Sequence, residues 1–353
     1  MVIQMKSSVY FAPLPGKSST AERAAAGKKV LESLLDCENI ALCREIPLKL
    51  HFGERGNKTF LKPEIYDPLI DILESHSVNS FFTETSVLYG GERFEAAKHI
   101  KLAEKHGFCR LPVIIADGEK GELSKSVAIP EGKHFKSAAI AEKLADAEQV
   151  LVVSHFKGHM LAGFGGAIKQ LSMGFAAKGG KMAMHLSVTP KIRSWKCKRC
   201  KLCQSRCNVG AITIEKKKVF IDPAVCIGCG ACFSICPAKA ISVFSLAGVK
   251  NMLFGKKHFR EKLAEYAYAS HHGKRNVYIT FAVDITPGCD CEPRRMSPCI
   301  PDIGVFASLD PVALDTACYE AAKRHGKSFK GYDQLAYAAK LGVGTMDYTV
   351  KEV

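Results

Sequence analysis

Eight cysteines in the middle of the chain repeat one spacing twice. The first run, Cys197, Cys200, Cys203 and Cys207, has the pattern C-x2-C-x2-C-x3-C, and the second run begins 29 residues later. Residues 211–214 (Ala-Ile-Thr-Ile) recur with the same offset at 240–243 (Ala-Ile-Ser-Val), so one unit is duplicated. An iron-sulfur cubane needs four thiolates, and the fourth cysteine of such a run ligates the cluster of the other run. The repeat therefore predicts two [4Fe-4S] clusters, one on Cys197, Cys200, Cys203 and Cys236 and one on Cys226, Cys229, Cys232 and Cys207.

Zinc ribbons and disulfides are the alternatives for so many cysteines, and the doubled pattern argues against both. The segment from Trp195 to Phe244 resembles the bacterial two-cluster ferredoxins. It departs from them at Asn208, where that family usually has proline. The departure affects the expected local turn and leaves the ligand set unchanged.

The composition is that of a globular protein that binds its clusters inside the cell. The chain has 353 residues, 47% hydrophobic and 24% charged, enough to bury the core of one large or two smaller domains. No apolar run approaches the about 18 residues that a membrane span needs. Residues 1–10 lack the apolar stretch of a signal peptide. Because cluster-forming cysteines favour a reducing compartment, we expect a cytoplasmic protein with no membrane association.

The net charge of +15 raises the question of an acidic partner. Much of the excess lies around the cysteine runs, at Lys196, Lys198, Arg199, Lys201, Arg206, Lys216, Lys217 and Lys218. Nucleic acid is disfavoured because the aromatic residues that a single-strand binder places between its basic residues are missing there. Basic residues around a cluster instead suit an acidic electron carrier such as a ferredoxin or flavodoxin.

Strands and amphipathic helices alternate on both sides of the cysteine runs. Strands are expected at 7–12, 48–52, 78–83, 111–116, 150–153, 276–283 and 303–308, and a helix is expected at 138–147. The alternation predicts an α/β fold with a largely parallel sheet and helices on its faces. Because the pattern resumes after the cysteines, residues 191–246 are interpreted as an inserted small α+β ferredoxin-like domain. Residues 1–190 and 247–353 then form the two parts of the α/β domain.

Three loops that carry polar residues should follow strands of this sheet. One carries His155, Lys157 and His159, the next carries Cys289, Cys291 and Cys299, and the third carries Asp310. In open parallel sheets, ligands bind outside the carboxyl ends of the strands. If the three strands are parallel neighbours, their loops meet at one crevice.

The first loop is the candidate catalytic site. Lys157 and Lys169 flank a glycine-rich turn that leads into a helix, an arrangement that suits an anionic group such as a carboxylate or phosphate. His155 and His159 are further candidates on the same loop. Residues 163–166 (Gly-Phe-Gly-Gly) do not match G-x-G-x-x-G, so no dinucleotide is inferred. The alternative is close backbone packing by small residues.

The second loop is a candidate metal site. Cys289, Cys291 and Cys299 could hold a third metal or iron-sulfur cluster with one open position, as catalytic metal sites have. The alternative is a set of reduced cysteines packed among prolines. Asp310, which precedes Pro311, is also explained as a helix N-cap. Asp302 and Asp315 are candidates for acid–base chemistry or ligation.

Three runs outside the insert resemble a known family. Residues 154–159 (Ser-His-Phe-Lys-Gly-His), 166–170 (Gly-Ala-Ile-Lys-Gln) and 302–315 are similar to domain of unknown function 362, whose members are often labelled uncharacterised iron-sulfur centre proteins. The resemblance covers most of the chain on both sides of the insert and implies no reaction.

We expect an iron-sulfur redox protein, an oxidoreductase that relays electrons from its two clusters to a small anionic substrate in the α/β domain. The alternative is an electron-transfer adaptor that docks a partner redox enzyme and has no chemistry of its own.

Overall fold

The structure is a computed structural model in which residues 6–186, 190–207, 209–216, 218–223, 225–226, 228, 230–242 and 256–353 are described. Among the residues named from the sequence, Asn208, the basic residue Lys217 and the predicted cluster ligand Cys229 lie outside these ranges. Within them, no helix is both long and apolar enough to cross a membrane.

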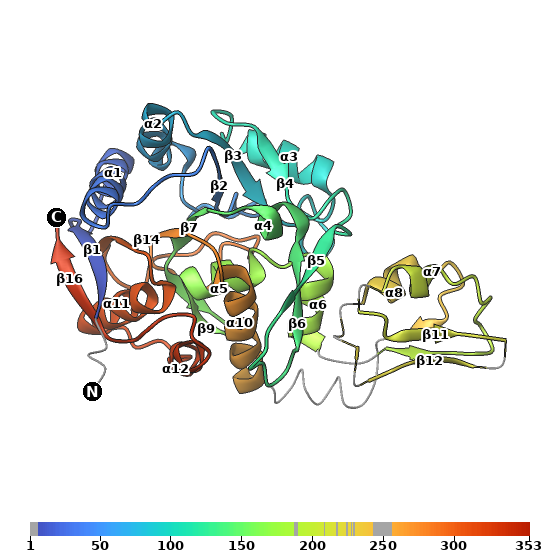
Figure 1. The fold of residues 1–353 in the computed structure, drawn as a ribbon. Coiled ribbons are helices and arrows are strands. Elements are labelled where there is room, and N and C mark those ends of the chain that lie inside the picture. Colours follow the sequence, from blue (N-terminus) through green and yellow to red (C-terminus); the bar gives the residue numbers. More distant parts are fainter. Residues whose placement is uncertain are drawn as a thin grey trace.

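An eight-stranded sheet forms the centre of the α/β domain (Figure 1). Its strands, in spatial order, are β16 (Tyr348–Glu352), β1 (Ser7–Pro13), β15 (Gly304–Ser308), β14 (Val277–Ala282), β7 (Leu151–His155), β2 (Glu45–Lys49), β3 (Asn79–Glu84) and β4 (Val113–Ile115). All neighbouring pairs are parallel except the two that involve β15. The predicted α/β fold with a largely parallel sheet is therefore confirmed.

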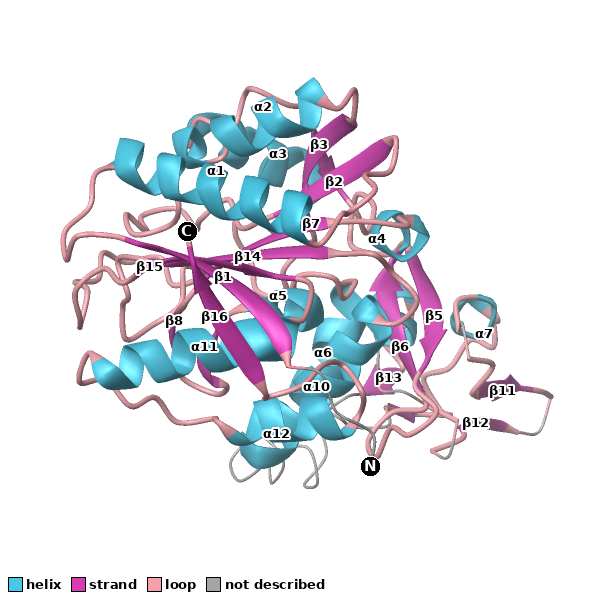
Figure 2. Cartoon of the chain, turned by 60° about the vertical axis from the view of Figure 1, so that its left-hand side comes forward, coloured by secondary structure: helices cyan, strands magenta, loops and turns pink. Residues whose placement is uncertain are grey.

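Helices cover both faces of this sheet (Figure 2). One face packs against α1 (Thr20–Cys37), the short η1 (Pro63–Ile65), α2 (Asp67–Ser75) and α3 (Ala96–Lys105). The other face packs against α5 (Ala167–Met173), α6 (Lys178–Leu186), α10 (Lys256–His271), α11 (Pro311–Arg324) and α12 (Asp333–Lys340). Strand residues alternate between the two cores, because Leu151 and Val153 face the first and Val152 faces the second.

The segment expected as one helix at 138–147 forms a strand followed by a short helix. β6 (Ser137–Ala141) pairs antiparallel with β5 (Ser124–Ala128), and α4 (Glu142–Asp146) follows. The alanines at 138, 139 and 141 favour a helix locally, but their burial beside a partner strand overrides that preference. A second hairpin, β8 (Lys157–His159) with β9 (Gly163–Gly165), forms within the expected lysine-glycine loop.

The cysteine-rich segment forms small elements of its own to one side of the large sheet (Figure 1). β10 (Lys191–Ile192) pairs with β13 (Ile241–Ser242), and β11 (Ile212–Ile214) pairs with β12 (Val219–Ile221), both antiparallel. Two short helices, α7 (Leu202–Ser205) and α8 (Ala231–Ile235), complete the segment. Its core is separate from the two cores of the α/β domain. The domain limits at 190 and 246 remain predictions, and the second falls outside the described residues.

Candidate functional site

Two of the three expected loops meet at the carboxyl ends of β7 and β14. These strands are parallel neighbours, and the loop that follows β14 is hydrogen-bonded to the segment after β7. The Gly158 N–H donates to the Thr286 carbonyl at 2.8 Å. A Cβ on Gly158 would lie 2.3 Å from the Pro287 carbonyl oxygen, so only glycine allows this approach. The predicted convergence of the histidine-lysine loop with the cysteine loop is therefore observed.

The third loop lies elsewhere, and that part of the prediction is wrong. β15 runs antiparallel to β14, so its carboxyl end, where Asp310 follows, is at the opposite edge of the sheet. Asp310 accepts from the backbone N–H groups of Val312 and Ala313 at 2.8 and 2.9 Å, which makes it the N-cap of α11. Asp302 is also structural, because its carboxylate binds Ser18 and Arg23.

Asp315 occupies the N-terminus of α5. Its carboxylate accepts from the N–H groups of Ala167 and Ile168 at 2.7 and 2.9 Å. A Cβ on Gly166 would lie 2.2 Å from Asp315 Oδ1, so this contact also requires a glycine. Burial raises the pKa of Asp315 to about 7 although both amides favour its ionised form. Because the carboxylate takes these amides, the helix N-terminus expected to bind an anion is already occupied.

Asp290 anchors the cysteine loop to the histidine-lysine loop. Its Oδ2 contacts the His155 Nδ1 at 2.9 Å and accepts from the Lys157 ammonium. The His155 Nε2 contacts the Val283 carbonyl oxygen at 2.7 Å, so acceptors face both ring nitrogens. Burial alone would raise the pKa of Asp290, but Lys157 and His155 outweigh burial and hold this pKa well below its usual range. Within the described ranges, Asp290 Oδ1 is buried without a hydrogen-bond partner.

The two cysteines that flank Asp290 lie beside Lys169 of α5. The Lys169 ammonium donates to the Cys289 sulfur at 3.5 Å. A hydrogen bond from the Cys291 thiol, together with Lys169 and Lys157, holds the pKa of Cys289 well below its usual value despite burial. The same pairing, with burial, raises the pKa of Cys291. Of the two cysteines, Cys289 is therefore the one whose ionised form its surroundings favour.

Cys299, the third cysteine of the predicted metal site, is turned away from this pair. Its thiol donates to the Ile285 carbonyl oxygen at 3.1 Å, and it does not line the cavity that Cys289 and Cys291 line. The third metal site remains a prediction, and the arrangement of these three described residues gives it no support.

A cavity of about 260 Å³ opens where these loops meet. All four predicted catalytic residues, His155, Lys157, His159 and Lys169, line it. We call it the cationic cavity after its lining of Arg93, Lys157, Lys169 and Lys181, with Cys289 and Cys291 in the same wall. His159 adds no positive charge there, because burial and the nearby Lys169 hold its pKa well below the usual value.

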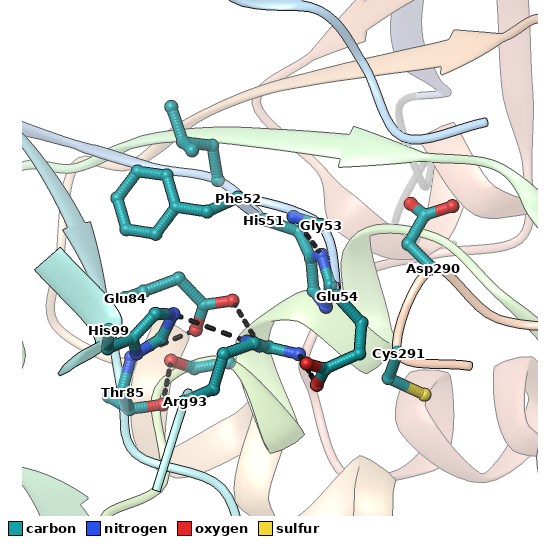
Figure 3. A network of polar contacts seen from close by, with 12 residues as sticks. His51, Phe52, Gly53, Glu54, Glu84, Thr85, Arg93, His99, Asp290 and Cys291 are labelled. Carbon is teal, nitrogen blue, oxygen red and sulfur yellow. Dashed lines mark hydrogen bonds and ion pairs between the residues drawn. The ribbon is translucent and has the colours of Figure 1, made fainter. Parts of the chain in front are cut away.

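Sequence reasoning missed the part of the cavity wall formed by the end of β3 and the loop after it. There Glu84 accepts from Arg93 at 2.9 Å and lies 3.4 Å from the Lys49 ammonium, while Arg93 also contacts His99 and Glu54 (Figure 3). Burial would raise the pKa of Glu84, but Lys49 and Arg93 lower it to about 2. The carboxylate is therefore held ionised inside the protein. Its one signal in the sequence is a charged residue at the end of a buried strand.

Lys181 on α6 was also missed, and the hydrogen-bond partners of its ammonium are neutral oxygens. Its ammonium donates to Thr85 Oγ1 and to the Ser86 carbonyl, both at 2.6 Å, and burial lowers its pKa to about 8. Among the described residues, neither Lys169 nor Lys181 has a carboxylate within 4.0 Å. Lys157 and Arg93, by contrast, are paired with Asp290 and Glu84. The cavity thus holds two ammonium groups that make no ion pair with a carboxylate within the described ranges, and an anionic ligand could accept hydrogen bonds from both.

The ferredoxin-like segment brings together the cysteines predicted for its first cluster. Cys197, Cys200, Cys203 and Cys236 line one small cavity, so the four thiols come from the expected positions in both runs. For the second cluster, Cys207, Cys226 and Cys232 are described, while Cys229 is not. In the described ranges no three thiol, imidazole or carboxylate groups close around a single point as metal ligands would.

The duplication seen in the sequence recurs in the backbone. The N–H groups of Arg199 and Gly228 donate to Cys197 and Cys226, both at 3.4 Å. The N–H groups of Ala211 and Ala240 donate to Cys207 and Cys236 at 3.2 and 3.3 Å. Left-handed residues also recur at the 29-residue offset, as Arg199 and Gly228, Lys201 and Gly230, and Gly210 and Lys239. Repeated N–H···S bonds are the contacts that stabilise cluster thiolates, so these residues fit iron-sulfur ligation.

The ferredoxin-like segment contacts the helix that carries Lys181. Met182 of α6 packs on Gly230, where a Cβ would lie 2.0 Å from the methionine sulfur. The Arg206 guanidinium donates to the Glu122 carbonyl at 2.9 Å, a second contact between segment and α/β domain. One helix therefore contacts the second cysteine run and also lines the cationic cavity through Lys181 and His185.

Comparisons with known proteins agree with the two parts of the chain. Two curated proteins match a short stretch each. One component of an ion-translocating oxidoreductase complex from Methanosarcina acetivorans is 45% identical over 47 residues, which are 13% of this chain and 18% of that protein. A 7Fe ferredoxin from Hydrogenibacillus schlegelii is 46% identical over 39 residues, which are 11% of this chain and 50% of that protein. The chain thus spans half or less of the length of these relatives.

Two solved structures resemble the chain over most of its length at low identity. A protein from Thermotoga maritima has a TM-score of 0.45 and 9% identity, over 88% of this chain and 60% of that one. The lactate racemase apoprotein from Thermoanaerobacterium thermosaccharolyticum has a TM-score of 0.38 and 12% identity, over 80% and 51%. The family described as domain of unknown function DUF362 matches residues 46–320. The chain belongs to this family and carries a ferredoxin-like iron-sulfur segment within it.

Proposed function

We propose that this member of the DUF362 family is an iron-sulfur oxidoreductase that passes electrons through two [4Fe-4S] clusters to a small anionic compound bound in the cationic cavity. The observation that carries the proposal is the helix α6. It packs on Gly230 in the second cysteine run, and its Lys181 lines the cavity. The cluster-binding segment and the substrate cavity would thus both contact the same helix.

The clusters supply one-electron transfer when they are bound. The chain supplies their ligands, Cys197, Cys200, Cys203 and Cys236 for one and Cys226, Cys229, Cys232 and Cys207 for the other. The four N–H···S bonds, at 3.2 to 3.4 Å, stabilise the charge on the thiolates. This favours the reduced state of each cluster, which carries one more negative charge.

The charges in the cavity support an anionic substrate. Lys169 faces the Cys289 sulfur and Lys181 faces neutral oxygens, so neither ammonium is paired with a carboxylate, and a carboxylate or phosphate group would gain charge-assisted hydrogen bonds from both. Lys157 is held by Asp290 and orients the loop. A volume of about 260 Å³ limits the ligand to a small molecule.

The surface of the ferredoxin-like segment suits an acidic electron carrier, such as a ferredoxin or flavodoxin. Trp195 is 78% exposed, and Leu202 and Val225 are also exposed. Basic residues, among them Lys196, Lys198, Arg199 and Lys201, lie next to them in the chain. An apolar centre with a basic rim is complementary to a carrier with an acidic rim. A reducing compartment such as the cytoplasm would keep both the clusters and the free thiols intact.

The same surface also suits the alternative function, that of an adaptor that docks a partner redox enzyme and catalyses no reaction itself. In that case Lys169→Met and Cys291→Ser would leave electron transfer to the partner unchanged. In an enzyme these substitutions would slow cluster reoxidation by substrate while the clusters remained intact.

The first experiment measures iron and acid-labile sulfide per chain under anaerobic conditions. Two clusters predict about eight of each in the wild type and in Cys291→Ser. About twelve in the wild type, falling to about eight in Cys291→Ser, would establish a third cluster on the cysteine loop. Fewer than about four in the wild type would refute the two-cluster proposal. Cys318→Ser, at a cysteine buried in α11, is the matched control for loss of a buried thiol.

A further inference from the structure

We propose that Cys289 and Cys291 form a redox-active pair that cycles between a dithiol and a disulfide in the wall of the cationic cavity. The inference deepens the proposed function, on which it rests for the source of electrons. It assigns the site where one-electron transfer is converted into a two-electron reaction.

The two cysteines are close neighbours on one loop. The Cys291 N–H donates to the Cys289 sulfur at 3.4 Å, and Asp290 alone separates the two residues in the chain. Both residues line the cavity. A bond between the sulfurs therefore joins two residues of one loop that lie in the same cavity wall.

Asp290 fixes the loop in this orientation. Its carboxylate is held by His155 and Lys157, and its carbonyl oxygen accepts from the Glu54 N–H at 3.2 Å. Figure 3 shows the Asp290 carboxyl and the Cys291 sulfur pointing away from one another. The contacts of Asp290 thus fix the loop while Cys289 and Cys291 line the cavity.

The surroundings of this pair are those of a reactive thiol rather than a buried structural one. Lys169 contacts the Cys289 sulfur, and a cation in that position favours the thiolate that attacks in thiol–disulfide exchange. Cys318 gives the contrast within the same chain, because it is packed in the apolar core of the sheet with α11. Cys299 does not line the cavity with the pair, and its thiol donates a hydrogen bond to the Ile285 carbonyl oxygen.

The reaction balances with reactants that the proposed function names. Reduction breaks the sulfur–sulfur bond, takes up two electrons and two protons, and leaves two thiols. The electrons come singly from the carrier through the clusters, and the protons come from solvent through the cavity. In the second half of the cycle, the dithiol gives two electrons and two protons to a bound anionic oxidant and returns to the disulfide.

The test uses the whole holoprotein under anaerobic conditions, treated with oxidised glutathione or with reduced dithiothreitol and then alkylated. Trypsin cleaves after Arg275 and Arg294, and the peptide 276–294 contains Cys289 and Cys291 but no other cysteine. In the oxidised sample we expect this peptide to be lighter by two hydrogen atoms and resistant to alkylation. In the reduced sample it should take two alkyl groups. Two alkyl groups in both samples would overturn the proposal.

Two variants separate this pair from other thiols. Cys299→Ser should keep the mass change, because that cysteine is not part of the pair. Cys291→Ser should abolish it and leave one alkylated cysteine in the peptide. If Cys299→Ser abolished the change, the proposed pairing would be wrong.

A second experiment tests the proposed electron relay separately from the cysteine pair. Reduced ferredoxin, a protein too large to enter the cavity, is offered to the oxidised holoprotein as the only reductant. If the disulfide opens with dithiothreitol but stays closed while ferredoxin reduces the clusters, the pair stands and the electron relay to the cavity is refuted.

Discussion

Glu84 offers the sharpest test of the buried charge network beside the cavity. The residue is 2% exposed, and its carboxylate lies 2.9 Å from Arg93 and 3.4 Å from Lys49. Glu84→Gln keeps the size of the side chain and removes its charge. Lys49 would then remain buried without its carboxylate partner, and Arg93 would keep only Glu54 at 3.7 Å, a state that costs much more than an exposed unpaired charge.

The magnitude follows from the pKa of this carboxyl. The network lowers it from the ordinary 4.5 to about 2. At about 1.4 kcal/mol for each pKa unit, the charge contributes about 3 kcal/mol to stability. Because this pKa is depressed, the contribution is complete above pH 4.5 and is lost as the pH falls through about 2. Removing one partner of a buried pair costs about 3–5 kcal/mol in general, which agrees with this value.

The assay is anaerobic urea denaturation at neutral pH, followed by circular dichroism. Glu148→Gln is the matched control, because that carboxylate is 80% exposed and its pairing with Arg275 should be worth less than about 1 kcal/mol. We expect Glu84→Gln to lower the free energy of unfolding by about 3 kcal/mol relative to this control. Adding Lys49→Met should recover part of the loss. Equal stability of the two single variants, within about 0.5 kcal/mol, would refute the reasoning.

Three further predictions concern the cavity. Binding of inorganic phosphate, measured by calorimetry, should weaken as the pH rises through about 8, because Lys181 loses its charge above its lowered pKa. Unchanged affinity from neutral pH to well above that value would contradict this role. Lys169→Met should weaken phosphate binding about tenfold or more, the loss of one charge-assisted hydrogen bond, and the exposed Lys98→Met should not. Gly158→Ala should destabilise the protein by about 1–3 kcal/mol and weaken phosphate binding, because its Cβ forces the two loops apart. Gly90→Ala, with nothing within 4 Å, is the control, and equal behaviour of the two would rule out the loop contact.

The part of the site that depends on parallel strands could be predicted from the sequence. β7 and β14 are short buried strands, and each is followed by a loop that carries reactive or charged side chains. Lys157 and Cys289 could therefore be expected to lie close together. The direction of each strand could not be predicted from the sequence. β15 is as apolar as its neighbours, and nothing in its pattern distinguishes an antiparallel strand from a parallel one. Asp310 was therefore assigned to the wrong edge.

The residues that sequence reasoning missed share a physical reason. Arg93 and Lys181 are ordinary charged residues in sequence, and only the fold buries them beside Glu84 and Thr85. Charged side chains are normally exposed, so their default interpretation is a solvated surface. The cysteine repeat is the opposite case, because its spacing alone specifies which thiols must come together, and Cys236 lines the cavity of the first run as expected.

Electron delivery from the clusters to the cavity is tested most directly by counting electrons. The holoprotein is first oxidised so that Cys289 and Cys291 are joined, and is then titrated with reduced ferredoxin while the cluster absorbance is followed. If the clusters feed the cavity, the wild type takes up two electrons more per chain than Cys291→Ser, and the peptide 276–294 regains both thiols. Equal uptake by the two proteins, with the disulfide intact after the clusters are reduced, would contradict the relay.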